Sequence, residues 1–508
     1  MSIETFSYFC QSQFMNFISR NGIFFQWSER FFSFLLKNRI VWLLWVFAGI
    51  QLIGIVDPPL EIAHSWRQSF TAMVTRNYVE FGMDWLHPRI NMAGEKTGIV
   101  GAEFPIFNFL SWLLCKAFGF QHWYGRFVNL VVVIFGAFHL YAMLKRIFSE
   151  RIAFHTIAFL LCSSWFTFSR KIMPDTFSVS LVFIGLRYGY DFIFSGRFTH
   201  WLISVVFIAL GVLSKIPALS LLAIAVVIPF SKDLSRLRKW LVILGLFLAV
   251  IPGFWWYFVW VPYLNVTYGY HLFFPKGLIE GWHEIVPLWQ LLLEKFYFTS
   301  LYSFLGLSIF LFGFVRLYQW NWSRLNWALL SVTVIFGLFI LKTGAVFPQH
   351  TYYSIPFVPV MCLMVSFGLE GLMVYGMKPR WLSVLAILIC VESISNQFHD
   401  HFIKDSEKYK QKLENDIANG IPKNAKIVMV SSANPQELYL IHRSGWTVFP
   451  EQVKTEADWN RLRNLGAQYV VINEAVIKNS KFEDAVIEQA CKWPMIFGNG
   501  DYLIFKLM

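Results

Sequence analysis

The chain has 508 residues, of which 56% are hydrophobic, 19% aromatic and only 15% charged, and its mean hydropathy is +0.51. Soluble globular domains have about 45–50% apolar and about 25% charged residues, so the composition excludes a soluble protein and indicates a polytopic α-helical membrane protein. The net charge of +12 suits cytoplasmic loops and anionic lipid better than nucleic acid. We therefore expect contact with membrane lipid and no nucleic-acid partner.

The first 38 residues alternate aromatic and polar positions and include Arg20, Arg30 and Lys37. This pattern predicts a cytoplasmic amphipathic N-terminal segment over residues 1–38. None of the six cysteines belongs to a CxxC pair, and most lie in apolar runs. We interpret them as small hydrophobic side chains, not as a disulfide framework or a zinc site.

Residues 39–397 predict a transmembrane domain of about eleven spans, since a span needs about 20 mainly apolar residues. The basic turns after every second span are expected on the cytoplasmic side under the positive-inside rule. A first outer loop over 57–124 and the tail from about 398 then lie on the opposite side. The expected spans are roughly 39–56, 125–144, 152–168, 176–194, 200–214, 217–230, 240–261, 299–315, 326–341, 353–376 and 381–397.

The apolar run 104–119 could form a further span, which would invert the orientation of every later one. It is short and contains Pro105, Asn108 and Lys116. We therefore expect an interfacial helix on the outer side.

The tail over 398–508 changes character and predicts a small α/β domain. Strand-like runs at 426–430, 469–472 and 502–505 alternate with helix-like runs at 435–442, 456–465 and 481–491. This alternation favours a mainly parallel sheet. Gly498-Asn499-Gly500 predicts a hairpin turn and not a nucleotide-binding loop.

Unusual polar residues follow the first span and recur in the other outer loops. Such groups at a membrane edge usually serve a functional site. Carboxylates can accept a proton from an acceptor hydroxyl, while Lys, Arg and His can stabilise a departing lipid phosphate. The candidates are Asp57, Glu61, His64, Arg67, Gln68, Glu103, Arg170, Lys171, Asp175, Lys215, His350, Tyr352 and Tyr353.

Structural alternatives remain for several of these candidates. Glu61 and His64 lie three residues apart and could form a salt bridge on a short helix. Asp175 follows a proline at the start of a span, where it could cap the helix. No cofactor is firmly indicated, and a divalent metal at Asp57, Glu61 and His64 is left open on weak spacing. The sequence has no Walker, HExxH or GxSxG motif and no dinucleotide fingerprint.

The order of these motifs resembles the GT-C glycosyltransferases, specifically the protein O-mannosyltransferase superfamily, which includes the bacterial transferase that adds aminoarabinose to lipid A. The resemblance covers roughly residues 40–400, and the segments 64–68 and 103–105 are similar to a bacterial family 39-like branch. The matching motifs are Glu103-Phe104-Pro105, Gly125-Arg126, Ser169-Arg170, Pro174-Asp175, Gly211 to Lys215, and His350 with Tyr352, Tyr353 and Pro356.

This resemblance implies a site built from the outer loops. In relatives, the first-loop acid usually lies shortly before an Arg-Tyr-Ala stretch. The corresponding positions in this sequence are Arg67-Gln68, which are not acids. The base is therefore expected at Glu61, Asp57 or the more distant Glu103. Asp175 is the second acid. Arg67, Lys215, His350 and Arg170 are expected to bind the donor phosphate. The remaining substrate-binding candidates are His64, Trp66, Gln68, Tyr352 and Tyr353.

The resemblance implies an integral membrane glycosyltransferase of the bacterial inner membrane with its site facing the periplasm. It would move a sugar, usually with inversion, from a polyprenyl-phosphate donor to a glycan, lipid or protein acceptor. A transporter or flippase of lipid-linked saccharides is an alternative that predicts mid-membrane charges and repeat symmetry, neither of which is evident. An assembly subunit of a surface-glycan pathway is a further alternative, because polymerases also have Arg and His in outer loops.

Overall fold

The computed structural model describes residues 38–507 except 233, 272–274, 320–322 and 418–419. The predicted amphipathic segment over 1–38 thus lies, apart from residue 38, outside the described residues. The chain forms two compact units, Met1–Ile50 and Gln51–Met508. Helix α3 (Arg39–Gln51) has a Trp-, Val- and Leu-rich sequence and agrees with the first part of the predicted span 39–56. All following elements belong to the second unit.

Apolar helices make up most of the second unit, as the composition predicts. Four described helices are long and apolar enough to cross a membrane, or up to six if each of two bent pairs counts as one span. The long ones are α6 (Tyr124–Ile147), α9 (Pro174–Ser195), the continuous helix Arg236–Tyr268 and α16 (Ser323–Thr343). The continuous helix consists of α11 (Arg236–Trp255), the π-helical η2 (Trp256–Trp260) and α12 (Val261–Tyr268).

Several predicted spans correspond to helices that are shorter than a full crossing. The predicted number of eleven spans therefore stays a prediction, although most of the predicted ranges contain an apolar helix. Prolines at the beginning of η1 (Ile216–Val227), α18 (Val358–Val374) and α19 (Pro379–Ser395) mark chain breaks of the kind that proline imposes. The helices concerned are α7 (Glu150–Cys162), α8 (Trp165–Phe168), α10 (Phe198–Ser214), the 3₁₀ helix η1 (Ile216–Val227), α15 (Phe304–Gln319), α18 (Val358–Val374) and α19 (Pro379–Ser395).

The expected outer connection 262–298 is mostly helical. It contains α13 (Leu278–Ile285), η3 (Val286–Leu288), α14 (Trp289–Glu294) and the π-helical η4 (Lys295–Thr299). The segment Leu278–Thr299 meets the helix Phe304–Leu317 at an angle of 94°. Short helices α17 (Val346–Gln349) and η5 (Thr351–Ser354) precede α18.

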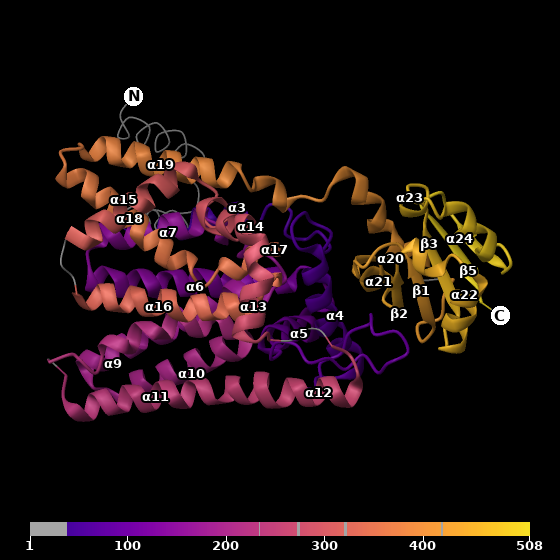
Figure 1. Cartoon of the computed structure of the whole chain (residues 1–508), viewed down its shortest axis with the longest axis horizontal. Coiled ribbons are helices and arrows are strands. Elements are labelled where there is room, and N and C mark those ends of the chain that lie inside the picture. Colours follow the sequence, from indigo (N-terminus) through magenta and orange to yellow (C-terminus); the bar gives the residue numbers. More distant parts are fainter. Residues whose placement is uncertain (1–37, 233, 272–274, 320–322, 418–419, 508) are drawn as a thin grey trace, which may run out of the picture. The chain divides into compact units, whose positions relative to one another are not determined.

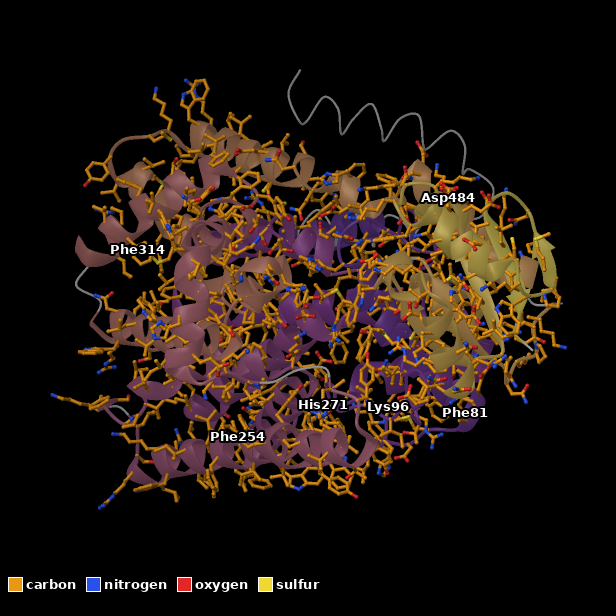
Figure 2. All side chains as sticks on the ribbon, turned by 45° about the vertical axis from the view of Figure 1, so that its right-hand side comes forward. Phe81, Lys96, Phe254, His271, Phe314 and Asp484 are labelled. Atoms are coloured by element: carbon orange, nitrogen blue, oxygen red, sulfur yellow. The ribbon has the colours of Figure 1, made fainter. Side chains whose placement is uncertain are left out.

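Large apolar side chains cover the outside of the helices. Phe254 on α11 and Phe314 on α15 are 45% and 47% exposed (Figure 2). Polar side chains such as Arg126, Arg170 and Asp175 are instead buried between helices. An apolar exterior around a polar interior is the arrangement that lipid favours, so the second unit is that of a multi-pass membrane protein.

The C-terminal region contains a five-stranded sheet of order β2-β1-β3-β5-β4 (Figure 1). The predicted strands and helices are all present, and Gly498-Asn499-Gly500 forms the predicted hairpin, with Gly500 at φ 85°. The prediction of a mainly parallel sheet is wrong, because β1 pairs in parallel with β2 and β3, whereas β5 pairs antiparallel with β3 and β4. The strands are β1 (Lys426–Val430), β2 (Ser444–Val448), β3 (Tyr469–Asn473), β4 (Met495–Gly498) and β5 (Tyr502–Lys506).

The sheet buries both of its faces. Ile427 and Met429 of β1 belong to one apolar cluster, while Val428 and Val430 belong to another. Successive strand residues point to opposite faces, so each face has its own core. Helices of this region are η6 (Phe398–His401), η7 (Asp405–Lys412), α20 (Leu413–Ile417), α21 (Gln436–Ile441), η8 (Pro450–Val453), α22 (Glu456–Asn464), α23 (Glu474–Ile477) and α24 (Glu483–Ala490).

The first outer loop folds onto this sheet region. It contains α4 (Ser65–Phe81) and α5 (Ile106–Phe118), the latter where an interfacial helix is expected. Backbone hydrogen bonds join Gly94 N to Gly445 O at 2.8 Å and Gly445 N to Asn91 O at 2.9 Å. Phe70 and Met73 of α4 share a buried apolar cluster with Leu438 and Tyr439 of α21. The loop and the sheet region are thus held together by a common core.

Candidate active site

The turn between α3 and α4 has an unusual backbone. Ala63 and His64 both have positive φ, at 64° and 56°, a conformation that is costly for residues other than glycine and recurs at functional sites. His64 Nε2 lies 3.0 Å from Thr351 Oγ1, and its ring stacks 5.8 Å from that of His350. These contacts hold the strained turn against His350 and the beginning of η5.

Glu61 lies in a closed cluster of cations beneath this turn. Its carboxylate is 2.5 Å from Arg170 Nη2, 2.7 Å from Lys171 Nζ and 3.4 Å from Arg126 Nη2, and all four side chains are fully buried. Burial alone would raise the pKa of Glu61, but the three cations lower it to about 2. Glu61 is therefore a permanent anion that three surrounding cations hold in place.

The same cations also bind the backbone of the turn. Arg126 donates to the carbonyl oxygens of Ile55 at 2.9 Å and of Pro58 at 3.1 Å, and to that of Asp57. Arg170 donates to Gln51 O at 3.2 Å and Gly54 O at 3.0 Å. The expected donor-phosphate residue Arg170 is therefore engaged in holding the turn. The sequence left open a salt bridge between Glu61 and His64. In the structure, Glu61 pairs instead with Arg126, Arg170 and Lys171.

A second group of charged side chains comes together from four separate parts of the chain. Lys215 Nζ lies 2.9 Å from Asp175 Oδ1 and 3.1 Å from a carboxylate oxygen of Glu103, which also pairs with Arg67. These side chains are between 5% and 19% exposed. Arg67, Glu103, Asp175 and Lys215 are hereafter called the Asp175 cluster. It unites two of the predicted acids with two of the predicted phosphate-binding cations.

Helix packing explains why Lys215 reaches Asp175. Asp175 is the second residue of α9, and Lys215 immediately follows α10. A Cβ on Gly211 would lie 2.7 Å from Val182 Cγ2 and 2.9 Å from the carbonyl oxygen of Ser178 on α9. Glycine at this position therefore allows close approach of the two helices and accounts for the Gly-x-x-x-Lys spacing.

Asp175 does not cap α9, which the sequence had left as an alternative. The N-cap residue is Met173, and it makes no side-chain capping bond. Asp175 Oδ1 contacts Lys215, whereas the buried Oδ2 has no hydrogen-bond partner within the described part of the chain. Buried carboxylate oxygens are normally hydrogen-bonded, so Oδ2 is an atom that the protein leaves available to another group.

Aromatic side chains form one wall beside Asp175. Lys215 Nζ lies 5.0 Å from the ring centre of Tyr352 and 5.8 Å from that of Tyr353. These three residues line a small pocket with Asp175, Ser178, Val179, Pro217, Ala218 and Pro356. The expected substrate residues Tyr352 and Tyr353 therefore lie at the Asp175 cluster.

The surroundings of His64 and His350 are electropositive. Burial, and after it the charges of the neighbouring His350, Lys171, Lys295 and Lys215, together lower the pKa of His64 to about 3. Burial likewise lowers the pKa of His350, with further lowering by Lys215, Arg67 and Lys295. Both imidazoles are therefore neutral at physiological pH, in a region where an anion would be stabilised.

Lys295 is a candidate that the sequence did not single out. It begins η4 and is 6% exposed, and its charge acts on both His64 and His350. A lysine within the otherwise apolar run after α14 was the available signal, because buried lysines are rare unless they have a function.

The structure gives Trp66 and Gln68 contacts within the protein. Trp66 Nε1 donates to the carbonyl of Ala433 at 3.0 Å, and Gln68 Oε1 accepts from Ile172 N at 3.2 Å. Asp57 contributes a carbonyl oxygen to Arg126. Within the described ranges no three His, Cys, Asp or Glu side chains are grouped closely enough to hold a metal ion, and Asp57, Glu61 and His64 therefore form no such group.

The comparisons with known proteins agree with this architecture. Residues 102–256 match the family model of dolichyl-phosphate-mannose-protein mannosyltransferases. The apo structure of ArnT from Cupriavidus metallidurans is similar over 93% of this chain and 98% of its own, with a TM-score of 0.63 and 12% identity.

The chain has the GT-C glycosyltransferase fold. The predicted resemblance to the GT-C superfamily is thereby confirmed. A structure of the same ArnT bound to undecaprenyl phosphate is similar over 92% of this chain and 97% of its own, with a TM-score of 0.57 and 11% identity. The apo oligosaccharyltransferase of Archaeoglobus fulgidus is similar over 85% of this chain and 69% of its own, with a TM-score of 0.56 and 11% identity. No curated protein matches the chain significantly in sequence.

The family match covers most of the Asp175 cluster. Glu103, Asp175 and Lys215 lie within residues 102–256, whereas Arg67 precedes this range. Glu61 and His350 also lie outside it.

Proposed function

We propose that the protein is an integral membrane glycosyltransferase that moves a sugar from a polyprenyl-phosphate donor to an acceptor hydroxyl. The observation on which this rests is the buried Asp175 carboxylate, with one oxygen on Lys215 and the other without a partner among the described residues. The family match and the similarity to an ArnT structure bound to undecaprenyl phosphate support the donor class.

In the proposed reaction, Asp175 Oδ2 accepts the proton of the acceptor hydroxyl. The acceptor oxygen forms a bond to the anomeric carbon as the bond from that carbon to the phosphate oxygen breaks. The polyprenyl phosphate leaves with an additional negative charge. A single displacement of this kind inverts the anomeric configuration.

Cations around the site would stabilise that charge. Arg67 and Lys215 are balanced by Glu103 and Asp175, so the phosphate would share them with the two carboxylates. Near His64, Lys295 adds a positive charge, and the neutral His350 adds a hydrogen-bond donor. Opposite charge and directed donors are the usual means of stabilising a leaving phosphate.

This assignment favours Asp175 over Glu61 as the base, with Glu103 as the acid that orients Arg67 and Lys215. Glu61 is surrounded by three cations and has no exposed side-chain surface. We assign Glu61, Arg170 and the carbonyl of Asp57 to holding the turn, and Trp66 and Gln68 to positioning α4. His64, Tyr352 and Tyr353 remain proposed substrate contacts.

We place the site on the periplasmic side of a bacterial inner membrane, since the basic turns are expected on the cytoplasmic side. The region 398–508 is then a periplasmic domain, with 39–397 as the membrane domain. The region 398–508 contacts the first outer loop at Gly94 and Trp66, which supports a role for this region near the acceptor. The proposed acceptor is a hydroxyl group of a glycan, a lipid or a protein.

The test measures sugar release from polyprenyl-phosphate donors by the purified full-length protein. Asp175→Asn is expected to reduce turnover by about 10²–10⁴-fold, the usual contribution of a general base, while leaving the protein folded. Asp484→Asn is a matched control, because Asp484 is also the second residue of its helix, α24, but is exposed.

Unchanged turnover in Asp175→Asn would remove Asp175 from the reaction. If the wild type neither transfers sugar nor hydrolyses any common donor, with acceptor lipids and glycans present, transport or assembly of lipid-linked saccharides would replace the proposed activity.

A further inference from the structure

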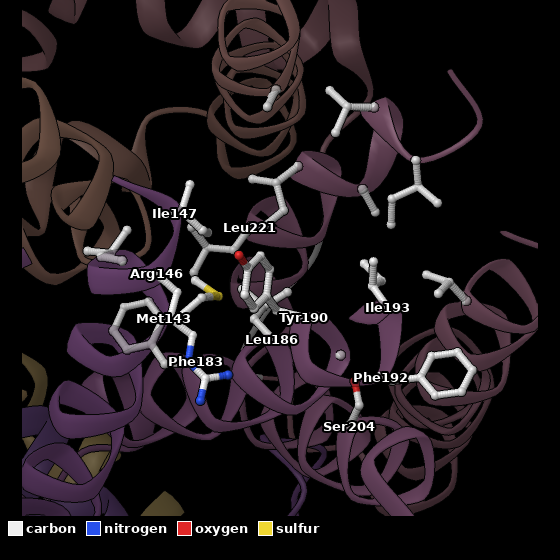
Figure 3. Close-up of a pocket in the computed structure, with 18 of the residues that line it drawn as sticks. Met143, Arg146, Ile147, Phe183, Leu186, Tyr190, Phe192, Ile193, Ser204 and Leu221 are labelled. Atoms are coloured by element: carbon white, nitrogen blue, oxygen red, sulfur yellow. The ribbon is translucent and has the colours of Figure 1, made fainter. Parts of the chain in front are cut away.

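A large cavity lies among the helices of the second unit. Its volume is about 890 Å³, within the size of about 300–1,000 Å³ that is usual for ligand pockets. Its walls come from α6, α7, α9, α10, η1, α11, α16 and α18. Figure 3 shows Phe183, Leu186 and Leu221 around the same space as Arg146 and Tyr190.

The cavity is remote from the Asp175 cluster along the helices. Asp175 is the second residue of α9, whereas the cavity is lined by α9 residues from Phe183 to Phe194. At a rise of 1.5 Å per residue, these lie about 12 to 28 Å along the helix from Asp175. On α10 the lining residues Trp201 and Ile208 likewise precede Lys215, which follows the opposite end of that helix. The cavity therefore lies toward the other leaflet of the membrane.

The lining combines apolar side chains with arginines. Arg146, Arg238 and Arg324 all line the cavity. Arg146 Nη1 lies 2.7 Å from Asp191 Oδ1, but Arg187 pairs with the same carboxylate. One acid thus balances two cations.

Arg238 adds a further positive charge. Its Nη1 donates to the carbonyl oxygens of Ile193 at 3.0 Å and Phe194 at 3.3 Å. Across the described ranges it forms no ion pair with a carboxylate. Among the described residues, the cavity therefore has an apolar interior and more lining cations than lining acids.

We propose that this cavity binds an anionic two-chain phospholipid from the leaflet opposite the active site. Its acyl chains would lie among the apolar residues of α9, η1 and α18, and its phosphate would be bound by Arg238 and Arg146. Basic pockets between membrane helices on the cytoplasmic side favour anionic headgroups, and arginine binds phosphate through paired donors. The lipid would join α6 and α9 to α16 and α18 and stabilise their packing.

The sign of the charge and the place of the cavity distinguish this occupant from others. A zwitterionic lipid would leave the excess positive charge unbalanced. A polyprenyl-phosphate donor bound here by its phosphate would have its reacting group at the wrong end of α9 for Asp175. The proposal concerns a lipid that stabilises the protein and is independent of the sugar-transfer reaction.

The test uses the full-length protein, purified in detergent and stripped of lipid. Phosphatidylglycerol or phosphatidylcholine is added, and bound lipid is counted by native mass spectrometry alongside thermal stability. The wild type is expected to retain phosphatidylglycerol preferentially and to be stabilised by it. Arg238→Gln removes a charged hydrogen bond and is expected to weaken retention by about tenfold or more.

A cavity-filling variant and a matched control complete the design. Ala225→Phe fills the cavity from η1 and is expected to abolish lipid retention. Arg238→Lys keeps the positive charge and is expected to preserve most of the lipid retention. Arg236→Gln removes an exposed charge outside the cavity lining and is expected to bind as the wild type does.

Equal retention of the two lipids, or wild-type retention by Arg238→Gln, would overturn the proposal. So would finding a polyprenyl lipid as the species displaced by Ala225→Phe. If Ala225→Phe does not fold, the comparison of Arg238→Gln with Arg238→Lys and Arg236→Gln decides the outcome alone.

Discussion

At the scale of single residues, burial separates a structural acid from a reactive one. Glu61 and Asp175 are both buried among cations, but among the described residues Glu61 faces three of them, whereas Asp175 forms an ion pair with Lys215 alone. A carboxylate surrounded in this way is stabilised as an anion and is a poor proton acceptor. Asp175 Oδ2, in contrast, lacks a partner in the described structure.

Glu61→Gln tests this distinction through stability. The substitution would leave Arg126, Arg170 and Lys171 without their common counterion, and breaking a buried ion pair costs about 3–5 kcal/mol. We expect the free energy of unfolding to fall by roughly that amount, measured as loss of the folded monomer on heating in detergent. A folded Glu61→Gln protein of normal thermal stability that has lost turnover would return Glu61 to the catalytic machinery.

At the scale of elements, the start of α4 links the sheet region to the site. Two hydrogen bonds join this helix start to the sheet region: Trp66 Nε1 donates to Ala433 O, and Asn434 Nδ2 donates to Ser65 Oγ at 3.2 Å. Arg67, which follows Trp66 in the chain, pairs with Glu103 at the site. Ala433 and Asn434 follow β1 at the carboxyl end of the parallel strands. Loops at that edge commonly hold functional contacts, and here one of them positions α4.

Trp66→Phe is the corresponding test. It removes the hydrogen bond to Ala433 but keeps an aromatic ring that can stack on Phe70. One hydrogen bond contributes about 0.5–1.5 kcal/mol, so we expect kcat/KM to fall by about 2- to 13-fold. The assay is sugar transfer from a polyprenyl-phosphate donor at fixed acceptor concentration.

Trp446→Phe is the matched control. Trp446 Nε1 donates to the Glu95 carboxylate at 3.2 Å, so this change removes another indole hydrogen bond elsewhere on the contact between the first outer loop and the sheet, in this case to a charged acceptor. Equal losses in both variants would show that the contact as a whole matters and that the Trp66 bond has no special role.

The elements were more predictable than their arrangement. The sequence predicted β1, β3 and β5 because their apolar runs, rich in valine and isoleucine in β1 and β3, are bounded by polar turns. It missed β2, which begins with Ser444-Gly445, and β4, whose residues are largely exposed. Both are edge strands of the sheet, where weak strand patterns are common. The antiparallel pairing of β3 with β5 was also not foreseen, although both strands were predicted, because strand direction depends on the connection through β4.

At the scale of the whole molecule, several buried or partly buried groups with lowered pKa values determine the response to acid, and three of them lie at the candidate site. The pKa of His64 is lowered from 6.5 to about 3, and those of Glu61 and Glu103 from 4.5 to about 2. For Glu103, burial opposes the lowering, which Arg67 and Lys215 cause. In each case the unfolded chain binds its proton at a higher pH than the folded one, so acid favours unfolding.

We therefore expect stability to be complete above about pH 6.5 and to decrease in two stages. His64, together with His401 and His442, contributes between pH 6.5 and about 3. Glu61 and Glu103, with Glu414, add a steeper loss between pH 4.5 and about 2. Each group adds at most about 1.4 kcal/mol per pH unit. Thermal unfolding between pH 8 and 4 measures the first stage, which should become shallower in His64→Gln. An unchanged slope in that variant would contradict the role of His64.

The sequence by itself determined that the protein belongs in a membrane, since its composition and apolar runs suit no other solvent. It also indicated the polar loops in which the candidate site residues lie and the α/β character of the C-terminal region. Local composition and periodicity are enough for such conclusions, because each depends on residues close in the chain.

Only the tertiary structure decided which of those residues belong together. Lys215 meets Asp175 because Gly211 lets α10 approach α9, and Glu61 is closed off because Arg126, Arg170 and Lys171 converge on it from other segments. Lys295 joins the surroundings of His64 in the same way. Some of these pairs lie far apart in the chain, and Lys171 and Glu61 are separated by more than a hundred residues. No local sequence pattern encodes such pairs. Packing alone separates the proposed base from the acid that holds the turn.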